Sequence, residues 1–191
     1  MTQHLRMRAA HSVLVLVDYQ ERLMPAMTGG AEAVRRAAFL AQVASQLDIP
    51  AVLTAQNPGR LGPNDGAISA HLADPGLVVE KMAFGACEGG LDDTLARYWD
   101  GPNTDRAIVV AGCEAHVCLL QTALGLLEAG RQVFVVADAS ASRHVHDKEL
   151  AMARLRQAGA IVVSAEMVAF EWLGTAEHPQ FKAVSKLVKE L

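Results

Sequence analysis

The chain has 191 residues, of which 51% are hydrophobic and 20% are charged, and its formal net charge is −4. This size and apolar content fit one globular domain with a full core, which we expect to span residues 1–191. The negative charge and the scattered Lys and Arg residues form no basic stripe, which argues against a nucleic-acid partner and against an anionic membrane surface.

The cysteine count and the N-terminal segment indicate a reducing, cytoplasmic setting. Three cysteines are an odd number and make no disulfide framework. Residues 1–11 are polar and mixed, lack the apolar core of a signal sequence, and are expected to form an N-terminal arm. The longest apolar runs have the length of strands, too short to cross a membrane.

The first half of the chain alternates strand patterns with helix patterns. Residues 12–17, SVLVLV, are apolar on both faces, which is typical of a central strand in a parallel sheet. Residues 31–47 carry apolar side chains at helical spacing. The other expected elements are a strand at 51–55, an irregular stretch at 56–66, a helical turn at 67–72, a strand at 77–81 and a helix at 91–99.

The second half opens with a strand, a tight turn and a helix. The apolar run 107–111 stops at Gly112, and a helical pattern then continues from Cys118 to Gly130. An apolar strand at 133–137 follows at once, which predicts a parallel βαβ unit with a right-handed crossover. Further on we expect a helix at 147–158, a sixth strand at 160–164 and two closing helices within 166–191. This alternation predicts a three-layer α/β domain with a mostly parallel sheet.

Three chemically complementary residues stand at expected strand ends, where α/β sheets bind ligands. Asp18 follows the first strand, Lys81 ends the third, and Cys118 lies in the first turn of the helix after the fourth. An acid, an amine and a thiol make a nucleophilic site, in which the acid takes the thiol proton and the amine holds the thiolate. The helix N-terminus is expected to bring the pKa of Cys118 from about 8.5 into a range of roughly 3.5–7.5.

Each of these residues also has a structural interpretation when it is taken alone. An Asp at a strand end caps a turn, a lysine extends to water, and a free cysteine packs as a small apolar group. Position alone would also allow Cys113, at the strand end, as the nucleophile. Cys87 lies outside these strand ends and is assigned a structural role.

The motifs around these residues resemble those of the isochorismatase-like hydrolase family, also called cysteine hydrolases. They are LVLVDYQERL with Asp18, VEKMAFGA with Lys81, and VVAGCEAHVCLLQTALGLLEAGRQVFVVADASASR with Cys118. The resemblance covers about residues 12–173. The segments TAQNPGRLGP and GTAEHPQFKAVSKLVKEL are most similar to the isochorismatase domain-containing branch.

The resemblance implies a fold and a mechanism. It implies a Rossmann-like six-stranded parallel sheet in the order 3-2-1-4-5-6 with helices on both faces, a homo-oligomer, and an Asp18–Lys81–Cys118 triad that hydrolyses amides and related C–N bonds. It further implies a cis peptide at Cys113–Glu114, which would direct the amides of Glu114 and Cys118 at an oxyanion. The resemblance, and not the spacing, selects Cys118 over Cys113.

Departures from the family pattern argue against a metal or a cofactor. Nicotinamidases of this family hold a metal with an Asp-x-His pair after the second strand, where this chain has AQNP at 55–58. The pair His144 and His146 lacks further ligands nearby, and no Gly-x-Gly-x-x-Gly motif follows the first strand. We expect neither a metal nor a dinucleotide.

These features together predict a metal-independent cysteine hydrolase that cleaves a small amide or related C–N bond through a thioester on Cys118. Two alternatives stay open: an isochorismatase-type ether hydrolase, and a non-catalytic binding or assembly module with the family fold. The expected partners are a small-molecule substrate and further copies of the chain, with the helices of 166–191 as contact surface. The substrate pocket is expected to be lined by Leu23, Gln56, Phe84 and Ala115.

Overall fold

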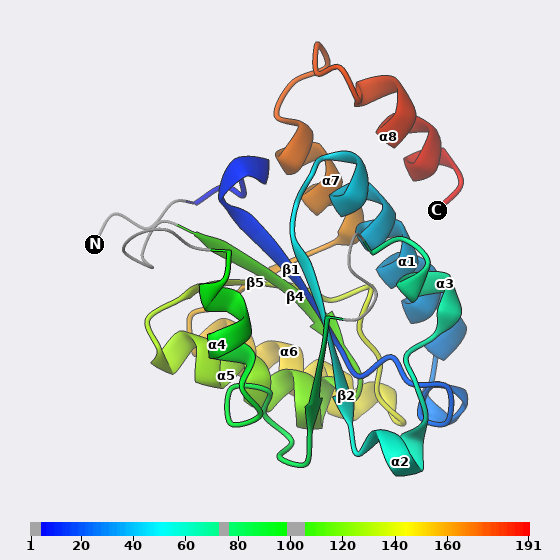
Figure 1. The fold of residues 1–191 in the computed structure, drawn as a ribbon, viewed down its shortest axis with the longest axis vertical. Helices are drawn as coiled ribbons and strands as arrows, with labels where there is room; N and C mark the ends of the chain where they lie inside the picture. The colour runs from blue at the N-terminus through cyan, green and yellow to red at the C-terminus, as the bar shows by residue number, and fades with distance from the viewer. Residues whose placement is uncertain (1–4, 73–76, 99–105) are drawn as a thin grey trace.

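A six-stranded, all-parallel sheet forms the centre of the computed structural model, which describes residues 5–72, 77–98 and 106–191 (Figure 1). The strand order is β3-β2-β1-β4-β5-β6, which confirms the expected three-layer α/β fold and the expected order. The strands are β1 (Ser12–Val17), β2 (Ala51–Gln56), β3 (Val78–Lys81), β4 (Ala107–Gly112), β5 (Gln132–Val136) and β6 (Ile161–Val163).

Helices cover both faces of this sheet. One face packs against α1 and α7, and the other against α4, α5 and α6. The helices are α1 (Gly30–Gln46), α2 (Pro58–Leu61), α3 (Gly66–Ser69), α4 (Leu91–Ala96), α5 (Leu120–Glu128), α6 (Val145–Gln157), α7 (Ala165–Leu173) and α8 (Phe181–Lys189). Single turns are η1 (Ala9–His11), η2 (Met24–Ala26) and the π-helical η4 (Ala115–Leu119).

The central strand β1 is apolar from Val13 to Val17, after Ser12, because it is covered on both faces. All six of its residues are buried, and the side chains alternate between the two layers of helices. Leu14 and Leu16 join the core under α1, whereas Val13, Val15 and Val17 join the core under α4 and α5. A strand covered on both sides has no solvent face, so no polar residue interrupts it.

The chain changes direction across the sheet between β1 and β4, and this is where the carboxyl ends of the inner strands meet. The two strands approach closely at their ends because residue 112 has no side chain. A Cβ atom on Gly112 would lie 2.5 Å from the Cβ of Val17. Open α/β sheets bind their ligands at such a switch point, which makes this edge the place to look for a functional site.

Three details differ from the sequence-based expectations, and a fourth expectation falls partly outside the described residues. The irregular stretch after β2 contains the short helix α2, which begins at Pro58, a residue suited to a first helical turn. The helix expected to start at Cys118 is preceded by the wider turn η4. The expected arm is tied down at Met7, which is 1% exposed in the core under α1 and α7. The end of the expected 91–99 helix, Trp99, lies outside the described residues.

Candidate active site

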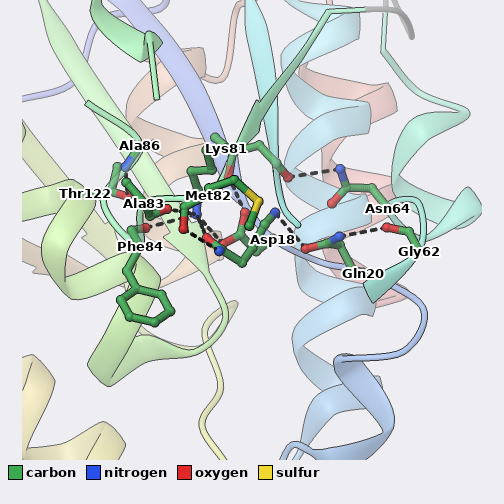
Figure 2. Close-up of polar contacts among 12 residues, drawn as sticks. Asp18, Gln20, Gly62, Asn64, Lys81, Met82, Ala83, Phe84, Ala86 and Thr122 are labelled. Carbon is green, nitrogen blue, oxygen red and sulfur yellow. Dashed lines mark hydrogen bonds and ion pairs between the residues drawn. The ribbon is translucent and has the colours of Figure 1, made fainter. Parts of the chain in front are cut away.

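Asp18 and Lys81 form a buried ion pair at the carboxyl edge of the sheet (Figure 2). Asp18 directly follows β1 in a left-handed conformation with φ of 57°, and Lys81 is the last residue of β3. The Lys81 Nζ atom lies 2.7 Å from Asp18 Oδ2, and both side chains are fully buried. The lysine chain is long enough to reach across β2, which lies between the two strands.

The Lys81 ammonium group is surrounded by hydrogen-bond acceptors. Besides Asp18, it donates to Gln56 Oε1 at 2.9 Å and to the carbonyl oxygen of Phe84 at 2.9 Å. The carbonyl of Ala83 lies farther away, at 3.4 Å. An ammonium has three N–H donors, and these three nearest acceptors occupy all of them.

The Asp18 carboxylate contacts several of the polar side chains of the site. Its Oδ1 accepts a hydrogen bond from the Thr54 hydroxyl at 2.6 Å, its Oδ2 accepts from Lys81, and its charge raises the pKa of the Cys118 thiol. The Thr54 hydroxyl and the Lys81 ammonium thus hold the two oxygens of the carboxylate in fixed positions. Such a carboxylate can act as a base toward the thiol.

The thiol of Cys118 is protonated in this arrangement, contrary to the expected lowering of its pKa, which is wrong. Burial raises the pKa of Cys118 to about 12; the charge of Asp18 and its hydrogen bond add to the rise, and the charge of Lys81 opposes it. The residue is 5% exposed. The loss of solvation therefore outweighs the favourable charge of Lys81.

The turn that carries Cys118 is wider than an α-helical turn. The Leu119 amide donates to the Glu114 carbonyl five residues back, at 3.2 Å, and the Cys113–Glu114 peptide bond is cis. The Glu114 carboxylate pairs with Arg143 Nε at 2.8 Å, and the Ala115 amide donates to the Ala141 carbonyl at 2.7 Å. These contacts fix the turn on both sides, whereas the oxyanion role of the Glu114 and Cys118 amides stays a prediction.

The other two cysteines occupy different surroundings. Cys113 is fully buried where β4 ends and hydrogen-bonds to the backbone of Ala141. Cys87 is half-buried and donates to the Thr122 carbonyl at 3.8 Å. Burial raises the pKa of both thiols to about 12.

The four residues expected to line the pocket lie in different surroundings, and not all of them are next to the triad. Gln56 is buried within the polar network and contacts Lys81. Ala115 is buried in the same apolar cluster as Cys118. Phe84 is 53% exposed, and its ring points away from the polar contacts, whereas its carbonyl binds Lys81 (Figure 2). Leu23 packs against the core on the α1 side of the sheet.

Three residues of the network had no sequence-based assignment. Thr54 binds Asp18, Asn64 Nδ2 donates to the Thr54 carbonyl at 3.0 Å, and Gln20 Oε1 accepts from the Gln56 amide at 2.9 Å. A signal for Thr54 was present, since it is a polar residue inside the apolar strand β2, two positions before Gln56. Asn64 and Gln20 lie outside the strands, and their contacts depend on tertiary structure.

The described residues include no group of three or more His, Cys, Asp or Glu side chains that could hold a metal ion. His146 lies on the surface with Glu149, 3.8 Å from it, and His144 precedes α6 as its N-terminal cap residue. Among the helices that the structure describes, none has both the length and the apolar character needed to cross a membrane.

Comparison with known proteins places the chain in a family. The Isochorismatase domain matches residues 12–167. The chain belongs to the isochorismatase family. Within it, isochorismatase domain-containing protein 2A of Mus musculus is 37% identical over 179 residues, which cover 94% of this chain and 83% of the relative. Isochorismatase domain-containing protein 2 of Homo sapiens is 36% identical over 185 residues, covering 97% of this chain and 86% of the relative.

A solved structure of the isochorismatase fold extends this likeness to three dimensions. A Caenorhabditis elegans protein described as MAR1 ribonuclease superimposes with a TM-score of 0.88 and is 33% identical. The match covers 96% of this chain and 92% of that one. The similarity to the domain-containing branch of the isochorismatase family therefore holds in sequence and in fold.

Proposed function

We propose that this member of the isochorismatase family is a metal-independent cysteine hydrolase that cleaves a small amide or related C–N bond. The observation that carries the proposal is the buried ion pair of Lys81 with Asp18 at 2.7 Å, together with the effect of the Asp18 charge, which raises the pKa of the nearby Cys118 thiol. The nucleophile, the base and the cation are thus neighbouring side chains, which is the arrangement that nucleophilic catalysis requires.

Acylation uses Asp18 twice. The Cys118 sulfur attacks the amide carbonyl carbon while its proton passes to the Asp18 carboxylate. The tetrahedral intermediate carries its negative charge on the former carbonyl oxygen, for which the amides of Glu114 and Cys118 are the proposed donors. When the intermediate collapses, the C–N bond breaks, Asp18 returns the proton to the leaving nitrogen, and a thioester remains on Cys118.

Deacylation reverses these proton movements. A water molecule gives a proton to Asp18 and attacks the thioester carbonyl. The C–S bond then breaks, the sulfur takes the proton back, and the carboxylic acid leaves. Lys81 stays paired with Asp18 and holds it in place through these steps. The raised pKa of Cys118 means that attack and proton transfer occur together, since little thiolate exists beforehand.

Mass spectrometry of the intact protein tests this function. A panel of small amides and ureides is incubated with the wild type, and a substrate should give a transient acyl adduct on the peptide that holds Cys118. Cys118→Ala should retain the fold and lose both the adduct and turnover, whereas Cys87→Ala should retain them. Full turnover by Cys118→Ala on a verified substrate would refute the thioester mechanism.

Two further substrates decide between this proposal and its competitors. Isochorismate cleavage that survives Cys118→Ala would indicate the ether-hydrolase alternative. RNA cleavage is worth assaying because the Caenorhabditis elegans relative is described as a ribonuclease. The absence of turnover on every substrate, with no adduct on Cys118, would favour the non-catalytic binding module.

A further inference from the structure

Strand β2 supplies one polar side chain to each member of the ion pair. Thr54 and Gln56 are two residues apart, so their side chains leave the same face of the strand. This face also carries Val52, which joins the apolar cluster that contains Cys118. Thr54 contacts Asp18 on the β1 side and Gln56 contacts Lys81 on the β3 side.

Both ends of the Gln56 amide group are occupied, which fixes its orientation. Its Nε2 donates to the carbonyl oxygen of Met82 at 2.8 Å. That oxygen can only accept, so the Oε1 atom must face Lys81, where it accepts from Nζ at 2.9 Å. The backbone amide of Gln56 donates to Gln20, whose own amide nitrogen donates to Gly62 at 2.7 Å.

We infer that Gln56 is a positioning residue that holds the Lys81 side chain against Asp18, and that it does not bind substrate. The inference rests on the proposed function, which it deepens by leaving Asp18 as the group that exchanges a proton with Cys118. Nζ donates to Gln56 Oε1 at 2.9 Å and to Asp18 Oδ2 at 2.7 Å, so the amide oxygen and the carboxylate together fix where the end of the lysine side chain lies.

The charged groups around the Cys118 thiol make it sensitive to Gln56. Asp18 at the end of β1 and Glu114 before η4 disfavour the thiolate, and Lys81 on β3 favours it. Loss of the Gln56 oxygen removes one of three acceptors from Lys81 and loosens its contact with Asp18. Of these three charged groups, Lys81 alone stabilises the Cys118 thiolate. When Lys81 is held less firmly, the thiolate is less stable and nucleophilic attack by the sulfur slows.

Alkylation of Cys118 by iodoacetamide tests the inference without a substrate. We expect Gln56→Met and Gln56→Asn to lower the rate at pH 8 about tenfold, which corresponds to a rise of roughly one unit in the apparent pKa of the thiol. Gln46→Met, the same change at the end of α1, should keep the wild-type rate. Cys87 provides an internal reference within each protein.

Gln56→Asn keeps a polar group at the site and serves if Gln56→Met fails to fold. A wild-type alkylation rate in either folded variant would overturn the inference. An equal slowing in Gln46→Met would do the same, because the effect would then not be specific to the Lys81 contact.

Steady-state kinetics on a verified amide separates positioning from substrate binding. A positioning role predicts a fall in kcat with a nearly unchanged KM, whereas a substrate contact predicts a raised KM with kcat retained. The latter result would refute the assignment. The two proposals also fail separately: slowed alkylation without turnover of any amide would refute the proposed function while supporting the role of Gln56.

Discussion

At the scale of single residues, Asp18 connects the members of the site, because the Lys81 ammonium and the Thr54 hydroxyl donate to it and its charge raises the pKa of the Cys118 thiol. It is fully buried, so its charge is balanced by Lys81 and not by water. Removing one member of such a pair leaves an uncompensated charge in the interior, which is costly for folding as well as for chemistry.

Asp18→Asn should therefore lower both activity and stability. Loss of the base should reduce kcat by roughly 10²–10⁴-fold. Buried, unpaired Lys81 should lower the free energy of unfolding by about 3–5 kcal/mol. Urea unfolding and turnover measure the two effects, and Asp93→Asn on the exposed side of α4 is the matched control. Wild-type turnover in Asp18→Asn would contradict the assignment of Asp18 as base.

Cys113 predicts a pH dependence of stability. Burial raises the pKa of its thiol from 9.0 to about 12, so between these values the folded chain binds the proton more tightly than the unfolded chain. The stabilisation is complete below pH 9 and is lost as the pH rises to 12. Cys113→Ala should reduce this decline by up to about 1.4 kcal/mol per pH unit, as measured by urea unfolding from pH 8 to pH 11. An unchanged slope would show that Cys113 is not responsible.

Residue types at strand ends were sufficient to propose the triad, but not to predict its protonation. Helix position alone suggested an acidic Cys118, because a sequence does not show how deeply a thiol is buried. Gln56 was assigned to the pocket for a related reason: its residue type suits a substrate contact, and only tertiary structure places its amide between Lys81 and Met82.

At the scale of secondary structure, the strands were the most predictable elements, since both faces of β1 and β4 are apolar and buried. Elements that depend on backbone hydrogen bonds escaped prediction, namely the wide turn η4 and the short helix α2. The N-terminal segment was expected to form an arm because it is polar, yet the buried side chain of Met7 decides its position.

Met7→Ala should destabilise the fold, whereas Leu5→Ala should not. Met7 is 1% exposed, and its amide donates to Glu171 Oε2 at 2.8 Å, which ties the segment to α7. Truncation of a buried methionine costs about 2–5 kcal/mol. Leu5 is 76% exposed, so its truncation removes little buried apolar surface. Thermal and urea unfolding compare the two variants, and equal stabilities would mean that the segment does not dock in solution.

At the scale of the whole molecule, the strand order 3-2-1-4-5-6 was predicted from the family resemblance alone, and the structure has this order. The sequence on its own predicted only the alternation of strands with helices. Association between copies remains a prediction. The face of α7 offers Met167 and Phe170, which are 49% and 41% exposed.

Phe170→Glu should reduce the molar mass in solution if the helices of 166–191 form the contact between copies. A charge placed in an apolar interface is desolvated without a partner and weakens association. Light scattering after size-exclusion chromatography measures the mass, and Lys182→Glu on the exposed side of α8 is the control for added negative charge. A monomeric wild type would refute association, and an unchanged oligomer would place the contact elsewhere.

The wide turn η4 has a consequence for insertions and deletions. Its hydrogen bond from Leu119 to Glu114 spans one residue more than an α-helical bond would. Shortening the 115–117 segment by one residue could let α5 continue as a regular helix, but it would rotate the sulfur by about 100° around the helix axis. We therefore expect such a deletion to be compatible with the helix α5 but to abolish activity, because the Cys118 sulfur would no longer face Asp18.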